Sequence, residues 1–185
     1  MNRFVKGNPL FCIGCRTCMV ACVVAHRGNG IFTTDPDSEN FNPRIHVVKT
    51  KTKTMTVQCH HCENAPCVKV CPVGALEKGT DSILLHEERC IGCKQCTLAC
   101  PFGAIQMKSV AGEGNVRVVA NKCDLCANTE EGVPACVSHC PTEALTFYEI
   151  DSVQNIVDKK NLQTALNAWA VKAVSYTHLT LPTKA

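Results

Sequence analysis

Sixteen cysteines, arranged in four quartets, constrain this chain of 185 residues more than any other feature. The first quartet, CIGCRTCMVAC from Cys12, recurs almost unchanged in the third, CIGCKQCTLAC from Cys90. The second and fourth quartets, which start at Cys59 and Cys123, carry extra residues between their second and third cysteines. Internal repetition of this kind indicates four variants of one structural unit.

The spacing within each quartet is typical of a [4Fe–4S] cluster. Three cysteines at short intervals let the backbone wrap one face of the cube, and in bacterial two-cluster ferredoxins the fourth cysteine binds the other cluster. Gly14 and Gly92 allow the backbone to approach the sulfurs closely, so that amide N–H groups offset negative charge there. The sequence therefore predicts four [4Fe–4S] clusters, with iron bound through the sixteen cysteines.

Proline directly follows the last cysteine in three quartets and is expected to end a short helix and turn the chain into a strand. The first quartet differs, because Val23 follows Cys22. The three prolines are Pro72, Pro101 and Pro141.

Zinc and disulfides are the other common uses of so many cysteines. A zinc ribbon needs two Cys-x-x-Cys pairs for one ion, which leaves the middle cysteine and the following proline unexplained. The first residues contain no export signal, so a reducing cytoplasm is expected and disulfides are not. No run of about eighteen apolar residues is present, so no membrane span is expected either.

Charge and motif content exclude several functions. The formal net charge of +3 counts cysteines as neutral thiols, whereas four oxidised clusters at about −2 each would bring the holoprotein to roughly −5. Nucleic-acid binding is therefore not expected. No nucleophile–base pair, phosphate loop or carboxylate dyad is evident, and His60 and His61 are expected to face solvent or to lie behind cluster ligands. The sequence predicts electron transfer without catalysis.

Short segments between the quartets favour strands, and the polar run at residues 49–53 is expected to be a hairpin loop. The segment 28–43, rich in Gly, Asn, Asp and Pro, is expected to be irregular. The predicted strands are residues 44–48, 54–58, 83–86, 116–119 and 145–148.

After Tyr148 the cysteines cease, and residues 151–173 are predicted to form a helical segment. Its apolar residues recur at helical spacing, so it either packs on its own cluster domain or docks a partner or another copy. Residues 174–185 resemble a translated sequencing adapter and are expected to be non-native, with the natural C-terminus missing. The apolar stripe consists of Leu162, Ala165, Leu166, Trp169, Ala170 and Ala173.

Over about residues 1–150, the chain resembles the four-cluster electron-transfer subunits of the dimethyl sulfoxide reductase beta-subunit family. Its segments MNRFV, CIGCRTC, QCHHCENAPC and NKCDLC are most similar to the small iron–sulfur subunits of formate hydrogenlyase and of hydrogen-dependent carbon dioxide reductase. The expected fold is α+β. It has two nested bacterial-ferredoxin-like halves, an inserted β-hairpin and a C-terminal amphipathic helix, and quartets 1 and 4 form one half while quartets 2 and 3 form the other.

The resemblance implies a crossed set of ligands, in which each cluster takes three cysteines from one quartet and one from its partner quartet. Cluster A would be held by Cys12, Cys15, Cys18 and Cys140, and cluster D by Cys123, Cys126, Cys136 and Cys22. Cluster B would be held by Cys59, Cys62, Cys67 and Cys100, and cluster C by Cys90, Cys93, Cys96 and Cys71.

The resemblance also implies the partners. Such subunits connect a molybdenum or tungsten formate dehydrogenase to a hydrogenase, or to another iron–sulfur subunit, in a cytoplasmic complex. Self-association through the C-terminal helix is a further expectation. The alternative is a free soluble carrier of the polyferredoxin type, which would need no docking helix.

Overall fold

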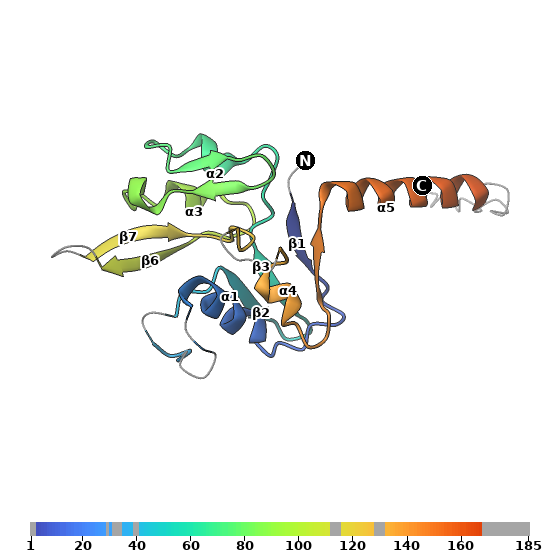
Figure 1. Cartoon of the computed structure of the whole chain (residues 1–185), viewed down its shortest axis with the longest axis horizontal. Coiled ribbons are helices and arrows are strands. Elements are labelled where there is room, and N and C mark those ends of the chain that lie inside the picture. The colour runs from blue at the N-terminus through green and yellow to red at the C-terminus, as the bar shows by residue number, and fades with distance from the viewer. Residues whose placement is uncertain are drawn as a thin grey trace, which may run out of the picture. The chain divides into compact units, whose positions relative to one another are not determined.

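The computed structural model describes residues 3–28, 30, 35–38, 41–111, 116–127 and 132–167 (Figure 1). The chain divides into two units, residues 1–150 and 151–185. The elements of the first unit, in chain order, are β1 (Phe4–Gly7), α1 (Thr17–Arg27), β2 (Ile45–Lys49), β3 (Thr54–Gln58), α2 (Pro66–Lys69), β4 (Leu76–Lys78), β5 (Ile83–Leu85), the 3₁₀ turn η2 (Glu87–Arg89), α3 (Gln95–Ala99), β6 (Gln106–Ala111), β7 (Val116–Asn121), α4 (Ala135–Ser138) and β8 (Leu145–Tyr148).

The described strands form antiparallel pairs: β1 with β8, β2 with β3, β4 with β5, and β6 with β7. The pair β1–β8 joins the two ends of the first unit, with Val5 opposite Phe147 and the ring of Phe4 stacked on Tyr148 at 5.2 Å between centroids. α1 packs against α4, and α2 against α3 (Figure 1). Elements of the first and fourth quartets are therefore neighbours, as are those of the second and third.

The prolines end three of the quartet helices as predicted. Cys100, which precedes Pro101, has an extended backbone with φ −76° and ψ 112°, because the proline ring excludes the helical conformation for the residue before it. A strand follows each of these helices, namely β4 after α2, β6 after α3 and β8 after α4. α1 has no such proline and continues past Cys22 to Arg27, where Gly28 ends it at φ 67°.

The predicted strands are confirmed, with shifts of one or two residues at some ends. Segments 54–58 and 145–148 coincide with β3 and β8, and residues 49–53 connect β2 and β3 in an antiparallel hairpin as predicted. The strand β1 was not predicted, because it depends on its partner strand β8, and β4 and β6 were expected only as the strands that follow Pro72 and Pro101. The described residues within segment 28–43 contain no helix or strand beyond the end of α1.

The hydrophobic core of the first unit consists of small clusters in which cysteines are themselves core residues. One cluster combines Val5, Ile45 and Leu145 with cysteines from several quartets, and another combines Leu76, Ile83 and Ile105 with cysteines of quartets 2 and 3. So little ordinary apolar packing means that metal–thiolate bonds must contribute much of the folding free energy.

The helix α5 spans Ile150–Asn167, and all of it except Ile150 belongs to the second unit. Leu162 and Leu166 are mostly exposed on it. Ala165 of the predicted apolar stripe is also exposed, whereas Trp169, Ala170 and Ala173 lie outside the described residues, as does the tail 174–185. No helix in the described part of the chain is long and apolar enough to cross a membrane.

Two glycines bring the loops of the repeated quartets against strands. Gly14 and Gly92 have left-handed φ values of 74° and 70°. A Cβ atom on Gly92 would lie 2.3 Å from the carbonyl oxygen of Val118 in β7, and one on Gly14 would lie 2.9 Å from the Cγ2 of Thr54 in β3. Only the second neighbour is a side chain that can turn away.

We predict that Gly92→Ala destabilises the holoprotein by about 2–4 kcal/mol, because it adds a backbone clash to the cost of a left-handed alanine. Gly103→Ala is the matched control, since Gly103 has φ 61° and no atom within 4 Å of its Cβ position. The control should cost only about 1 kcal/mol. Thermal unfolding followed by loss of cluster absorbance measures both, and equal shifts would contradict the argument.

Candidate iron–sulfur sites

Two surface hollows are lined by three cysteines of one quartet and the last cysteine of another. The first hollow is lined by Cys12, Cys15, Cys18 and Cys140. The second hollow is lined by Cys90, Cys93, Cys96 and Cys71. Their similar lining matches the near-identity of the first and third quartets.

The remaining eight cysteines lie deeper and form two further sets. Burial, followed by the nearby thiols of Cys59 and Cys100, raises the pKa of Cys67 to about 11. Burial, the Cys123 thiol and the Cys22 thiol likewise raise the pKa of Cys136 far above its usual range. The structure thus places Cys100 beside the second quartet and Cys22 beside the fourth.

The four sets differ in their exposure to solvent. Cys15 and Cys93, in the two hollows, are exposed. In the set of Cys22 with the fourth-quartet cysteines Cys123, Cys126 and Cys136, every member is buried. The two sets that contain Cys15 and Cys93 therefore open to the surface, and the set that contains Cys22 is covered. In the remaining set, Cys59 and Cys67 are buried, and Cys62 and Cys100 are half-buried.

Backbone amides point at the sulfurs in each half of the unit. Ala75 N lies 3.2 Å from Cys71 Sγ, and Arg44 N lies 3.3 Å from Cys22 Sγ. Burial would raise the pKa of the Cys71 thiol, but the amides of the turn after it outweigh burial and lower that pKa. Further amides at 3.4 Å are those of His61 to Cys59, Ala120 to Cys90 and Leu125 to Cys123.

These surroundings fit a group that binds thiolates. Burial, followed by the neighbouring thiols of Cys15, Cys12 and Cys140, raises the pKa of Cys18 to about 12, so iron must supply the positive charge that holds such thiols deprotonated. In the described residues, no three His, Cys, Asp or Glu side chains converge tightly enough for a single metal ion.

An ion-pair network ties α1 to the loop of the fourth quartet. Asp124 accepts a hydrogen bond from His26 Nε2 at 2.8 Å and another from the Arg44 guanidinium. Burial would raise the pKa of Asp124, but His26 and Arg44 hold it well below its usual range. Burial would lower the pKa of His26, but its hydrogen bonds to Asp124 and Cys22 raise that pKa to about 10. The ring is therefore an imidazolium. Its Nδ1–H donates a hydrogen bond to the Cys22 carbonyl.

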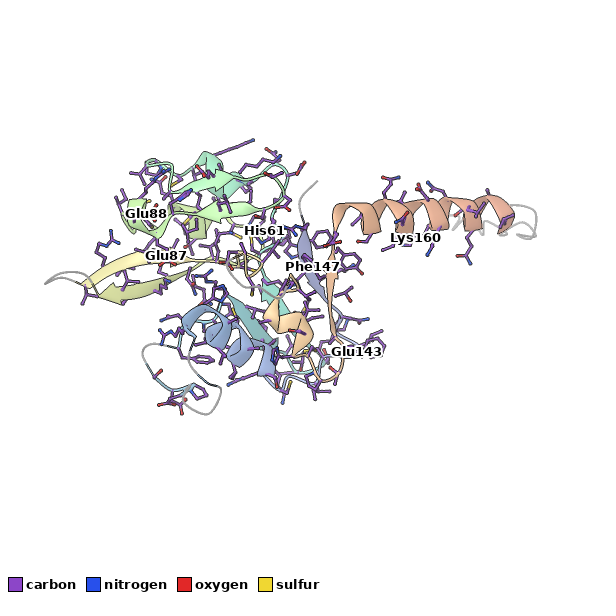
Figure 2. The ribbon with its side chains drawn as sticks, viewed as in Figure 1. His61, Glu87, Glu88, Glu143, Phe147 and Lys160 are labelled. Atoms are coloured by element: carbon purple, nitrogen blue, oxygen red, sulfur yellow. The ribbon has the colours of Figure 1, made fainter. Side chains whose placement is uncertain are left out.

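The two histidines of the second quartet have different environments. His60 is exposed and stacks on Phe102 at 4.2 Å between ring centroids. His61 is buried inside the first unit (Figure 2), where its Nδ1 accepts the amide of Ile83 at 3.0 Å. Burial and the nearby Lys122 charge lower the pKa of His61 to about 3, so this ring is neutral.

Arg16 and Lys94 are exposed at the starts of α1 and α3. The sequence reasoning missed Asp124 and Lys122, which flank Cys123. The available signal was two charged residues on either side of a cysteine, but only the fold shows that Lys122 is buried and Asp124 largely so.

Comparison with known proteins agrees with this geometry. Models of the 4Fe-4S dicluster domain match residues 50–150 and 11–75. The chain belongs to the 4Fe–4S dicluster family. Together with the sixteen cysteines, these matches support four [4Fe–4S] clusters as its cofactors.

Relatives in this family include several Escherichia coli proteins. Electron transport protein HydN is 44% identical, with 90% of this chain and 99% of the relative aligned. Hydrogenase-4 component A is 40% identical over 86% of this chain and 89% of its own length, and formate hydrogenlyase subunit 2 is 35% identical over 86% and 88%. The chain spans only about a quarter, 25% and 24%, of two longer relatives that are named putative oxidoreductases.

We predict that Asp124→Asn destabilises the holoprotein by about 3 kcal/mol, because it leaves the largely buried His26 and Arg44 charges without their shared partner. Asp81→Asn serves as the control. Asp81 pairs with Arg3 while both side chains are about one-third exposed, at 30% and 37%, so its loss should cost less than about 1 kcal/mol. The readout is the temperature of cluster loss, and a larger effect at Asp81 would contradict the network's importance.

Proposed function

We propose that this chain is an electron-transfer subunit in which four clusters are held by crossed ligands, as in the dimethyl sulfoxide reductase beta-subunit family. The observation that supports the proposal is that Cys140 lines the hollow of the first-quartet loop and Cys71 lines that of the third-quartet loop. The ligand sets are A (Cys12, Cys15, Cys18, Cys140), B (Cys59, Cys62, Cys67, Cys100), C (Cys90, Cys93, Cys96, Cys71) and D (Cys123, Cys126, Cys136, Cys22). This arrangement corresponds to two nested halves within residues 1–150.

The neighbours of each set give the order of the clusters. Cys18 of set A influences the Cys136 thiol of set D, and Cys59 of set B influences the Cys123 thiol of set D. Sets B and C share the second and third quartets, whose helices α2 and α3 pack together. The order A–D–B–C follows, with A and C at the ends.

Both end clusters would be accessible to a redox partner. The hollow of set A and that of set C each lie beside exposed apolar side chains, which a partner surface can cover when it brings its own cofactor close. The exposed side chain that lines the hollow of set A is Ile13, and those that line the hollow of set C are Val73 and Ile91. No catalytic group is assigned in the described residues, so electrons would enter at one end and leave at the other.

The relatives' names suggest the two partners. Two of them are a hydrogenase component and a formate hydrogenlyase subunit. We therefore propose that the chain connects a molybdenum or tungsten formate dehydrogenase to a hydrogenase, or to another iron–sulfur subunit, in a cytoplasmic complex. Residues 151–173 would be the docking or self-association helix, and residues 174–185 a non-native tail. The alternative is a free carrier of the polyferredoxin type.

Cysteine variants test the crossed ligands. Cys140→Ala should remove cluster A, so its reduced electron paramagnetic resonance spectrum should match that of Cys15→Ala and differ from that of Cys126→Ala. Cys22→Ala should show the reverse pattern. Iron analysis checks that each variant loses about four irons of about sixteen. If the Cys140→Ala spectrum matches that of Cys126→Ala, each quartet binds its own cluster.

Native purification tests the partnership. A tagged chain isolated from its own cells should copurify in fixed ratio with a formate dehydrogenase and a hydrogenase, and formate should reduce its clusters within that complex. Elution of the chain alone at its own mass, with clusters reducible by several unrelated donors, would support the free carrier instead.

A further inference from the structure

Lys122 is a buried charge between the end of β7 and the ligand Cys123. The residue is only 2% exposed. Its Nζ donates hydrogen bonds to the carbonyl oxygens of Ile83, at 2.5 Å, and Cys123, at 2.6 Å. Because Ile83 belongs to the second-quartet half and Cys123 to the fourth quartet, this ammonium lies where the two halves meet.

The groups around Lys122 do not neutralise it. Both of its hydrogen bonds in the described residues go to neutral carbonyl groups. The nearby His61 ring is neutral, and the Asp124 carboxylate already accepts hydrogen bonds from His26 and Arg44. A buried ammonium with only carbonyl partners would cost several kcal/mol unless other negative charge lay near.

The negative charge near Lys122 belongs to the inner sulfur sets. Its ammonium interacts electrostatically with the thiol of Cys67, in set B, and with that of Cys123, in set D. The charged side chains between the cysteines of the end sets A and C, Arg16 and Lys94, are instead exposed and screened by solvent.

We propose that Lys122 is the shared counter-charge of clusters B and D and raises the reduction potential of both. Reduction adds one negative charge to a cluster, and a fixed cation in a poorly hydrated site stabilises that charge. Lys122 thereby makes the middle of the cluster chain easier to reduce, so an electron from either end can enter it. This inference rests on the crossed ligand sets proposed above.

Redox titration of the holoprotein, followed by electron paramagnetic resonance, tests the proposal with three variants. Lys122→Met removes the charge and keeps the length of the side chain, Lys122→Gln removes the charge but keeps a donor for the carbonyls, and Lys122→Arg keeps the charge. Lys94→Met is the control at the outer cluster C. Iron analysis and thermal unfolding accompany each titration, because a merely structural role would change stability and leave the potentials unaltered.

In Lys122→Met and Lys122→Gln, we expect two of the four clusters to show a reduced-to-oxidised ratio about tenfold lower at a fixed potential, which for one electron corresponds to about 59 mV. Lys122→Arg should stay within about twofold of the unchanged protein, and Lys94→Met should leave these two clusters unaffected. Unchanged potentials in a neutral variant with full iron would overturn the proposal. Failure of both neutral variants to load the inner clusters, with Lys122→Arg loading normally, would overturn it in favour of a structural role. Fewer than four clusters in the unchanged protein would instead refute the ligand sets.

Discussion

The fold places the last cysteine of one quartet beside the three-cysteine loop of another, and we propose that each such set of four sulfurs holds one [4Fe–4S] cube. Cys140 reaches the first loop because β8 pairs with β1, and Cys71 reaches the third because α2 packs on α3. The apolar clusters around these contacts are small and include the cysteines themselves. Cluster binding and folding therefore depend on the same contacts.

Negative charge is the second constraint, because burial opposes the thiolates that iron requires. Backbone amides near the sulfurs oppose this effect of burial, and glycines in the repeated loops allow amides and sulfurs to approach each other. It also places cations near the deepest sets, with Arg44 and His26 around Asp124 and with Lys122 between the halves. The end sets A and C lie at the surface, where solvent also stabilises the negative charge.

Much of the fold and of the candidate site could be predicted from the sequence, since the repeated spacing defines the cofactor and the prolines mark where three helices end. Strands with strong β-formers, such as 54–58, were also predictable. The strand β1 was not, because four residues acquire their structure only by pairing with β8 some 140 residues later. Lys122 and Asp124 were missed for a similar reason: their burial and partners depend on contacts between quartets, which local pattern does not encode.

The most direct test of the crossed ligands is an anomalous-diffraction map of crystals of the holoprotein, recorded at the iron absorption edge. We predict four separate groups of iron peaks in the order A–D–B–C, with the cluster bound by Cys12, Cys15 and Cys18 also ligated by Cys140, and the cluster of the fourth quartet ligated by Cys22. Ligation of the first-quartet cluster by Cys22 instead would contradict the central claim.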